Sequence, residues 1–209
     1  GLGASASLAT AIIRAFYDFF DAELPQKDLL FYANFSENIT HGKSSGIDVA
    51  TVNSEHPLWF IKDSTIEPFE LNLHGFIVIG DTGVHGFTSQ AINIVREKLV
   101  EEKEKTQDSI NHLGQLATDS KDFLMTDKLK EFGHVMNKAH ERLSDLGVSH
   151  PRLDNLVETA RKNGALGAKL TGSGLGGVMV ALAENEKDAI RISQRLLKNG
   201  AKNTWIYSF

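Results

Sequence analysis

The last quarter of the chain most narrowly limits what it can fold into, because its hydrophobic pattern changes from one short element to the next. From residue 164 onward the pattern predicts a strand, a glycine-rich turn, a second strand, a helix and a third strand. These predicted elements are residues 168–170, the turn 171–177, residues 178–182, the helix 185–199 that Gly200 ends, and a strand through Trp205, Tyr207 and Phe209. The sequence therefore predicts a β-turn-β-α-β unit at the C-terminus.

One more strand and one more helix, upstream, extend this unit to a complete sheet. The apolar run 76–79, closed by GDTG, predicts a strand, and Thr88 is the predicted N-cap of the helix that follows. Together with the C-terminal unit they form a split β-α-β, ferredoxin-like sheet. Residues 106–163 predict at least three additional helices inserted in it, with breaks near 118–120 and 146–151. The predicted fold class is α+β.

The N-terminal third is predicted to be mainly helical. An apolar stripe at helical spacing predicts a helix over about residues 5–22 with one buried face. The members of this stripe are Leu8, Ile12, Phe16, Phe19 and Phe20. Pro25 can begin a second helix that runs towards Glu37, and two glycines in residues 41–46 end it before a further helical stretch. Residues 58–61 predict a short buried strand.

Composition excludes several classes of partner. The 209 residues carry 22 Lys and Arg against 27 Asp and Glu, a formal net charge of −5, and no basic stripe of the kind that nucleic acid requires. Without cysteine, neither a disulfide nor a thiolate metal site can form. No apolar run approaches the ~20 residues that span a bilayer, and the N-terminus does not resemble a signal peptide. We therefore expect a cytoplasmic protein with no nucleic-acid or membrane partner.

The first seven residues, GLGASAS, are a glycine loop that runs straight into a helix. A helix N-terminus presents unpaired backbone N–H groups and the positive end of the helix dipole, and glycines let a ligand approach that backbone closely. The loop therefore predicts a phosphate cradle. Since the chain begins inside this predicted site and without an initiator Met, we expect it to be a piece of a longer protein that lacks an N-terminal portion.

Two other glycine motifs fail the context that their best-known functions need. Residues 171–177 contain a literal G-x-G-x-x-G, but a dinucleotide fingerprint opens a helix, and these glycines lead into a strand. A glycine-rich hairpin without a ligand stays open as an alternative for this segment. The triplet GKS at 42–44 could end a P-loop, but the earlier glycine would have to stand at position 37, which is a glutamate.

Glu37 and Asp48 are candidate acidic site residues. They lie about three helical turns apart, so an unbroken helix would place both on one face. The two glycines between them argue against such a helix, and the pair must instead meet through the fold. One carboxylate would then bind a divalent cation and the other would take a proton. The alternative for each is a solvated surface charge.

The chain contains three sequence motifs, GLGASAS at 1–7, HGKSSGID at 41–48 and KLTGSG at 169–174. They resemble the G-L-G-S-S-A phosphate loop, the H-G-N-P-S-G-[IV]-D segment and the K-L-T-G-[AS]-G-G-G-G loop of the GHMP kinase superfamily, and within it of the mevalonate kinase family. The resemblance runs from residue 1 to about 182. The chain departs from these patterns at Ala4, which replaces the first loop serine, at Lys43 and Ser44, which replace Asn-Pro, and at Leu175, where glycine is usual.

The resemblance implies a GHMP-kinase-like fold of two domains. Residues 1–70 would be the helical remainder of the N-terminal, ATP-binding domain. Residues 71–209 would be the C-terminal domain, with the ferredoxin-like sheet and its inserted helices. The implied small-molecule ligands are ATP, Mg²⁺ and mevalonate.

For the site, the resemblance implies that the Ser5 hydroxyl and the Glu37 carboxylate hold Mg²⁺, and that Asp48 orients and deprotonates the mevalonate hydroxyl. The ATP phosphates would be bound by the opening loop, namely Gly1, Gly3, Ala4, Ser5, Ala6 and Ser7. The substrate pocket would be formed by Gly172, Ser173, Gly174 and Thr88. As a helix cap, Thr88 has an equally good structural explanation. His41 and His140 are expected to have structural roles.

The implied function is ATP-dependent phosphorylation of mevalonate to 5-phosphomevalonate, in isoprenoid precursor biosynthesis. Two alternatives stay open. The first is another small-molecule GHMP kinase, such as a phosphomevalonate or homoserine kinase. The second is a non-catalytic binding module that uses the helices of residues 106–163. The sequence also leaves a homodimer open.

Overall fold

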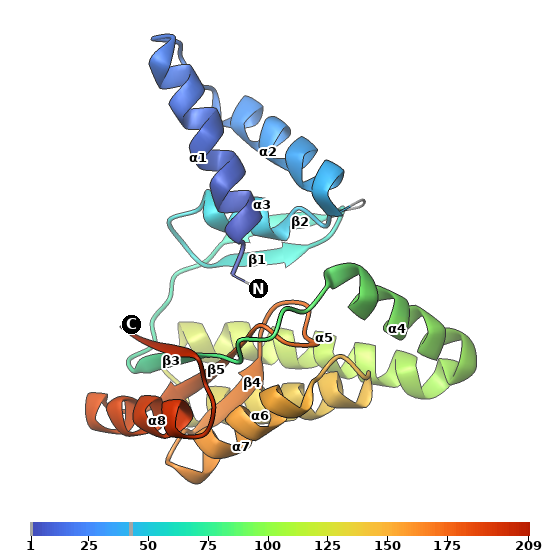
Figure 1. Cartoon of the computed structure of the whole chain (residues 1–209), viewed down its shortest axis with the longest axis vertical. Helices are drawn as coiled ribbons and strands as arrows, with labels where there is room; N and C mark the ends of the chain where they lie inside the picture. Colours follow the sequence, from blue (N-terminus) through green and yellow to red (C-terminus); the bar gives the residue numbers. More distant parts are fainter. Residues whose placement is uncertain (1, 42–43) are drawn as a thin grey trace. The chain divides into compact units, whose positions relative to one another are not determined.

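A computed structural model describes residues 2–41 and 44–209 of the chain. The chain divides into two compact units, Leu2–Leu71 and Asn72–Phe209 (Figure 1). In the part that the structure describes, none of the helices has both the length and the hydropathy needed to cross a membrane.

The smaller unit consists of helices and one hairpin. Its elements are α1 (Ala4–Phe19), α2 (Gln26–His41), α3 (Ile47–Val52), β1 (Leu58–Ile61) and β2 (Thr65–Pro68). The two strands pair antiparallel, with Trp59 opposite Glu67. The sequence patterns predict β1 but not β2, since only one residue of its TIEP segment is strongly apolar.

The three helices meet at small side chains. Ala6, Ala33 and Val49, one from each helix, form a cluster with no exposed surface. Small residues let helix axes approach closely, so this contact sets how the three helices cross. Asn53, the C-cap of α3, adds a polar tie, because its amide donates to the hydroxyl of buried Thr10 on α1 at 3.1 Å.

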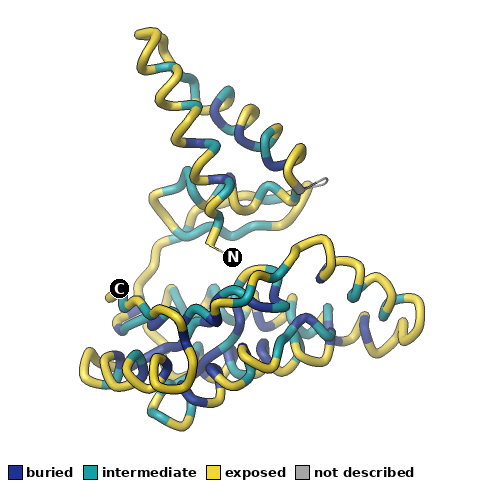
Figure 2. The backbone as a smooth tube through the Cα atoms, viewed as in Figure 1, coloured by how far each residue is buried: buried dark blue, intermediate teal, exposed yellow. Residues whose placement is uncertain are grey.

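The predicted helix over residues 5–22 is present, but the prediction that its apolar stripe is buried is wrong for the described chain. All five stripe residues are exposed, from 48% for Ile12 to 81% for Phe19. The buried residues of α1 are instead Ala6 and Thr10, which face α2 and α3, and Figure 2 shows most of the helix exposed. Helical periodicity determines which face is apolar, but not whether another layer covers it.

The larger unit is built on a four-stranded antiparallel sheet. Its strands are β3 (Phe76–Asp81), β4 (Gly167–Leu170), β5 (Val178–Ala183) and β6 (Asn203–Ser208), in the order β4-β5-β3-β6. The first strand in sequence thus lies between the third and the fourth, as the split β-α-β pattern requires. This confirms the predicted ferredoxin-like sheet.

Five helices accompany the sheet: α4 (Thr88–Glu101), α5 (Lys103–Met125), α6 (Leu129–Asp145), α7 (Pro151–Lys162) and α8 (Glu186–Lys198) (Figure 1). Helices α7 and α8 bury one face of the sheet. Leu153 and Leu156 of α7 and Ile192 and Leu196 of α8 pack there against Val78 and its strand neighbours. Asn185 caps α8 by accepting from the Asp188 N–H at 3.0 Å, which agrees with the predicted start of this helix.

One predicted helix break is wrong. Helix α5 continues through residues 118–120, where polar residues suggest an end. Thr118 and Ser120 donate their hydroxyls to the carbonyl oxygens four positions earlier, at 3.2 and 2.7 Å, so their polar groups are satisfied within the helix. The helix ends instead at Met125, shortly before Asp127, whose φ of 54° is left-handed. The other predicted break, near 146–151, is confirmed.

Alanine substitutions at two helical glycines should have opposite effects on the stability of the protein. A Cβ on Gly133 of α6 would lie 2.7 Å from the Leu166 backbone, whereas a Cβ on Gly114 of α5 would meet no atom within 4 Å. We expect Gly114→Ala to raise the free energy of unfolding by about 0.5–1 kcal/mol. Gly133→Ala should lower it by about 1–3 kcal/mol, because α6 and the start of β4 must separate. Urea denaturation of both variants tests this, and a stabilised Gly133→Ala would contradict the close approach.

Candidate functional site

The smaller unit brings together the elements that carry three predicted site residues. Ser5 on α1 immediately precedes Ala6, and Asp48 on α3 immediately precedes Val49. Glu37 on α2 lies one helical turn after Ala33. Because Ala6, Ala33 and Val49 are in contact, Ser5, Glu37 and Asp48 each lie within about one helical turn of the place where the three helices meet.

The opening loop passes beside Asp48. Gly3 is the N-cap of α1 and has a left-handed backbone with φ 68°, and no side chain caps the helix. A Cβ on Gly3 would lie 3.2 Å from Val52 Cγ2 and 3.9 Å from the Asp48 carboxylate oxygen Oδ1. The first turn of a helix leaves N–H groups without intrahelical acceptors. The predicted phosphate cradle, in the part from Leu2 onward, therefore adjoins Asp48; Gly1 lies outside the described residues.

The two acidic residues differ in their surroundings. Glu37 is only 2% exposed, whereas Asp48 is exposed in the first turn of α3. A negative charge is favoured in that first turn by the helix dipole. An ionised carboxylate is rarely fully buried unless it is paired or binds a metal. Burial thus distinguishes the two carboxylates, because a ligand in solvent can reach Asp48 whereas Glu37 is enclosed by the protein.

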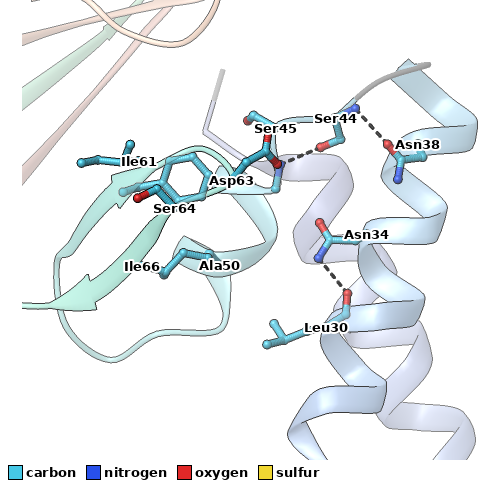
Figure 3. Close-up of a pocket in the computed structure, with 12 residues that line it drawn as sticks. Leu30, Asn34, Asn38, Ser44, Ser45, Ala50, Ile61, Asp63, Ser64 and Ile66 are labelled. Atoms are coloured by element: carbon cyan, nitrogen blue, oxygen red, sulfur yellow. Dashed lines mark hydrogen bonds between the residues drawn. The ribbon is translucent and has the colours of Figure 1, made fainter. Parts of the chain in front are cut away.

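The segment between α2 and α3 is held by short polar contacts. The Ser44 N–H donates to Asn38 Oδ1 at 2.9 Å, and the Gly46 N–H donates to Ser44 Oγ at 3.2 Å (Figure 3). Gly46, with φ 85°, then caps α3. These contacts link the residue after Glu37 to the start of the helix that carries Asp48. Position 43, where the sequence predicts an added charge, lies outside the described residues.

Asn38 is a residue that sequence reasoning missed. The only signal in the sequence is an asparagine near the end of a helix, ahead of a segment with serine and glycine, and asparagine side chains often accept from backbone N–H groups in such places.

A hollow of about 440 Å³ lies between α2, the segment 44–46, α3 and the β1–β2 hairpin (Figure 3). Its lining mixes polar and apolar side chains: Leu30, Asn34, Asn38, Ser44, Ser45, Gly46, Ala50, Phe60, Ile61, Asp63, Ser64 and Ile66. None of the predicted catalytic, metal or phosphate residues lines it. This hollow is therefore next to the candidate site in sequence but does not contain its side chains.

The larger unit holds the second predicted glycine loop, between β4 and β5. Gly172 and Gly174 have left-handed backbones, with φ 77° and 82°. The Leu175 N–H donates to the Val148 carbonyl oxygen at 2.8 Å. A Cβ on Gly174 would overlap that same carbonyl oxygen. The loop is thus packed directly against the segment that joins α6 to α7.

The segment after β3 packs on the other side of this loop. The hydroxyl of buried Thr82 donates to the Gly177 carbonyl oxygen at 2.7 Å, and the Gly177 N–H donates to the Val84 carbonyl oxygen at 2.6 Å. A Cβ on Gly86 would overlap the Gly174 carbonyl oxygen. These contacts order the chain that leads to Thr88.

Thr88 is not the helix cap that the sequence predicts. Helix α4 begins at Thr88, and its N-cap is Phe87, whose side chain cannot cap. The extended backbone of Phe87, with φ −104° and ψ 121°, moves the boundary by one residue. The exposed Thr88 hydroxyl is therefore not used as a cap.

Leu175, the departure from the family pattern, has φ 58°. It thus adopts the backbone conformation that glycine would adopt there, and its side chain packs against the cluster of Ala91, Leu146 and Val148. Its hydrophobic contact offsets the conformational cost of a side chain in this region.

In the part of the site that the structure describes, the candidate metal ligands are oxygen atoms. Among residues 2–41 and 44–209, no group of three His, Asp or Glu side chains could hold a metal ion by itself. The Ser5 hydroxyl and the Glu37 carboxylate are hard oxygen donors, which suit Mg²⁺. A Mg²⁺ ion in kinase sites takes one or two protein ligands and completes its shell with phosphate oxygens and water. The residues present therefore fit a Mg²⁺–nucleotide complex.

Two family descriptions match this chain. Residues 1–54 match "GHMP kinases N terminal domain", and residues 121–202 match "GHMP kinases C terminal". The first range contains the opening loop, Glu37 and Asp48, and the second contains the loop between β4 and β5. The two matches thus fall on the candidate site residues of both units, except for Thr88.

The chain is also similar to individual proteins. It is 36% identical to a mevalonate kinase from Pyrococcus horikoshii, over 88% of this chain and 56% of that relative. A crystal structure of L. major mevalonate kinase in complex with R-mevalonate matches with a TM-score of 0.90 at 26% identity, over 99% of this chain and 65% of that one. A mevalonate kinase structure from Staphylococcus aureus MRSA252 matches with a TM-score of 0.75 at 35% identity, over 99% and 66%. The chain thus spans less than two thirds of these relatives, and it belongs to the GHMP kinase family.

Proposed function

We propose that the protein containing this chain transfers the γ-phosphoryl group of ATP to the primary hydroxyl of mevalonate, producing 5-phosphomevalonate. The observation that carries the proposal is the contact between α1, α2 and α3, since it sets the glycine loop beside Asp48. The similarity to proteins named mevalonate kinase, one of them solved with R-mevalonate, supports the choice of acceptor.

In this proposal the nucleotide is held by the start of α1. Backbone N–H groups of Gly3, Ala4, Ser5 and Ala6, with Gly1 before them, bind its phosphates at the positive end of the helix. The Ser7 N–H, which the sequence assigns to the same role, already donates to the Gly3 carbonyl oxygen at 2.9 Å. The Ser5 hydroxyl and the buried Glu37 carboxylate hold Mg²⁺. Bound Mg²⁺ would neutralise charge on the β- and γ-phosphates.

Asp48 acts on the acceptor. Its exposed carboxylate accepts a hydrogen bond from the mevalonate hydroxyl and orients that oxygen towards the γ-phosphorus. It takes the hydroxyl proton as the new P–O bond forms and the bond from the γ-phosphorus to the β,γ-bridging oxygen breaks, which releases ADP. Phosphoryl transfer is largely dissociative, so positioning contributes more than base strength. Gly172, Ser173, Gly174 and the exposed Thr88 hydroxyl contribute to the substrate pocket.

A coupled assay of ADP release from the full-length protein tests the acceptor. We expect the highest kcat/KM with mevalonate among mevalonate, phosphomevalonate, homoserine and galactose. A higher value with phosphomevalonate or homoserine would support the alternative of another GHMP kinase. Calorimetry with ATP and Mg²⁺ tests the non-catalytic alternative, because a module without a kinase site should show no Mg²⁺-dependent nucleotide binding.

Glu37→Gln should raise the Mg²⁺ concentration needed for half-maximal activity. The amide keeps the shape of the side chain but removes the negative charge that a hard cation prefers, so we expect a shift of about tenfold or more. Titration of the assay with MgCl₂ measures it, with exposed Glu23→Gln as the control. An unchanged Mg²⁺ requirement in Glu37→Gln would remove Glu37 from the proposed metal site.

A further inference from the structure

A buried histidine holds the start of the loop between β4 and β5. His140 of α6 is 6% exposed, and its Nδ1 accepts from the backbone N–H of Leu170, the last residue of β4, at 3.3 Å. The Leu170 carbonyl oxygen accepts from Lys169 Nζ at 2.6 Å. Both backbone groups of Leu170 are thus bound by side chains just before the loop begins.

The end of the same loop is connected to His140 by a second route. His140 Nε2 lies 3.2 Å from Asp154 Oδ1 of α7, and the Ser149 hydroxyl donates to this same oxygen. The residue before Ser149 is Val148, whose carbonyl oxygen accepts the Leu175 N–H at 2.8 Å. These hydrogen bonds and the covalent backbone together form a closed circuit. It runs from Leu170 along the loop to Leu175, continues through Val148, Ser149 and Asp154 to His140, and returns by the His140 hydrogen bond to Leu170.

The geometry requires one form of the imidazole. Since Nδ1 accepts from a backbone N–H, it carries no proton, and the proton of the neutral ring must be on Nε2, where it donates to Asp154. Burial, and then the positive charge of Arg161, lower the pKa of His140, while Asp154 opposes them and Lys169 adds a smaller lowering effect. Protonation of Nδ1 would break the bond to Leu170.

We infer that His140 is a positioning residue for the loop 171–174, acting as the Nε2–H tautomer through its bonds to Leu170 and Asp154. Buried at 6% exposure, it acts through the loop by fixing both of the loop's ends. Its effect on turnover rests on the proposed function, whereas its effect on the loop depends only on the hydrogen bonds described above.

Two substitutions separate the two ring nitrogens. The Oδ1 atom of asparagine can take the place of Nδ1, so His140→Asn retains an acceptor for the Leu170 N–H. The amide of glutamine reaches the place of Nε2, so His140→Gln retains a partner for Asp154 but leaves the Leu170 N–H without its acceptor. His134→Gln, at an exposed position of the same helix, is the matched control.

Three measurements on the full-length protein test the inference. In ¹⁵N spectra, His140 should show an unprotonated Nδ1 and a protonated Nε2 at neutral pH. Hydrogen exchange of the Leu170 amide should be faster by about tenfold in His140→Gln, the equivalent of one lost hydrogen bond, and nearly unchanged in His140→Asn. The kcat with mevalonate should fall by about 10- to 100-fold in His140→Gln, with partial rescue in His140→Asn and little change in the KM for ATP.

The outcomes are distinct. A proton on Nδ1, or equal Leu170 exchange in the two variants, overturns the inference. Faster exchange with unchanged kcat overturns the positioning role in turnover. If the wild-type protein does not phosphorylate mevalonate while the tautomer and exchange results are as expected, the proposed function fails and the role of His140 in holding the loop is supported. Equal losses of thermal stability and kcat in both variants would indicate a purely structural role and also count against the inference.

Discussion

Asp48→Asn should lower kcat with mevalonate by about 10²- to 10⁴-fold, the range expected for loss of a general base that also orients its substrate. The change keeps the size of the side chain but removes its ability to take a proton. Because Asp48 is exposed, the substitution should not disturb the packed cluster of Ala6, Ala33 and Val49. Binding of Mg²⁺–ATP, measured by calorimetry, should therefore remain close to that of the wild type.

Asp18→Asn is the matched control, since Asp18 is also exposed on a helix of the smaller unit but lies far along α1 from the opening loop. It should leave kcat and ATP binding unchanged. If Asp48→Asn retained most of its turnover, the proton would have to go to another group, and the role of Asp48 would be wrong. If both variants lost ATP binding, the effect would be on folding of the unit.

Gly174→Ala should have a large effect in the larger unit. A Cβ at this position would collide with the Val148 carbonyl oxygen, which belongs to the backbone and cannot rotate away. The φ of 82° adds the strain of an L side chain in a left-handed conformation. We expect the free energy of unfolding to fall by roughly 2–5 kcal/mol, and kcat/KM for mevalonate to fall with the displaced loop.

Gly177→Ala is a control that separates the backbone strain of a left-handed residue from the steric clash of its Cβ. Gly177 has a similar φ of 72°, but a Cβ there would meet no atom within 4 Å. It should lower the free energy of unfolding by only about 1–2 kcal/mol, the effect of the backbone conformation alone. Urea denaturation of both variants measures the difference. Equal losses would mean that the loop is not packed against the Val148 carbonyl.

Much of the larger unit could be predicted from local pattern. Strands β3 and β5 are mainly apolar runs that directly follow Gly75 and Gly177, β4 leads into the glycine-rich turn 171–177, and α8 is delimited by Asn185 and Gly200. Each of these signals depends only on residues that are close together in the sequence, so a single sequence is enough to recognise it. The order of the elements then restricts the sheet to few topologies.

The wrong predictions have a different origin. Helix α5 does not end near residue 118 because the hydroxyls of Thr118 and Ser120 bond back to carbonyl oxygens of the same helix, which composition does not reveal. Strand β2 forms because β1 lies beside it, rather than from its own residues. The stripe on α1 is apolar as predicted, but no described element covers it. In each case the outcome depends on contacts that the local pattern does not contain.

The amino-acid sequence by itself determined most of the helices and strands, the glycines that turn the chain, and the residue types able to bind a phosphate, a hard cation and a proton. Only the tertiary structure decided that Gly3 adjoins Asp48, that Glu37 is buried while Asp48 is exposed, and that His140 and Val148 hold the two ends of one loop. The physical reason is the distance along the chain over which each interaction acts. Backbone preference and side-chain chemistry belong to single residues and their neighbours, whereas burial and hydrogen-bond geometry between distant segments arise only when helices and strands pack.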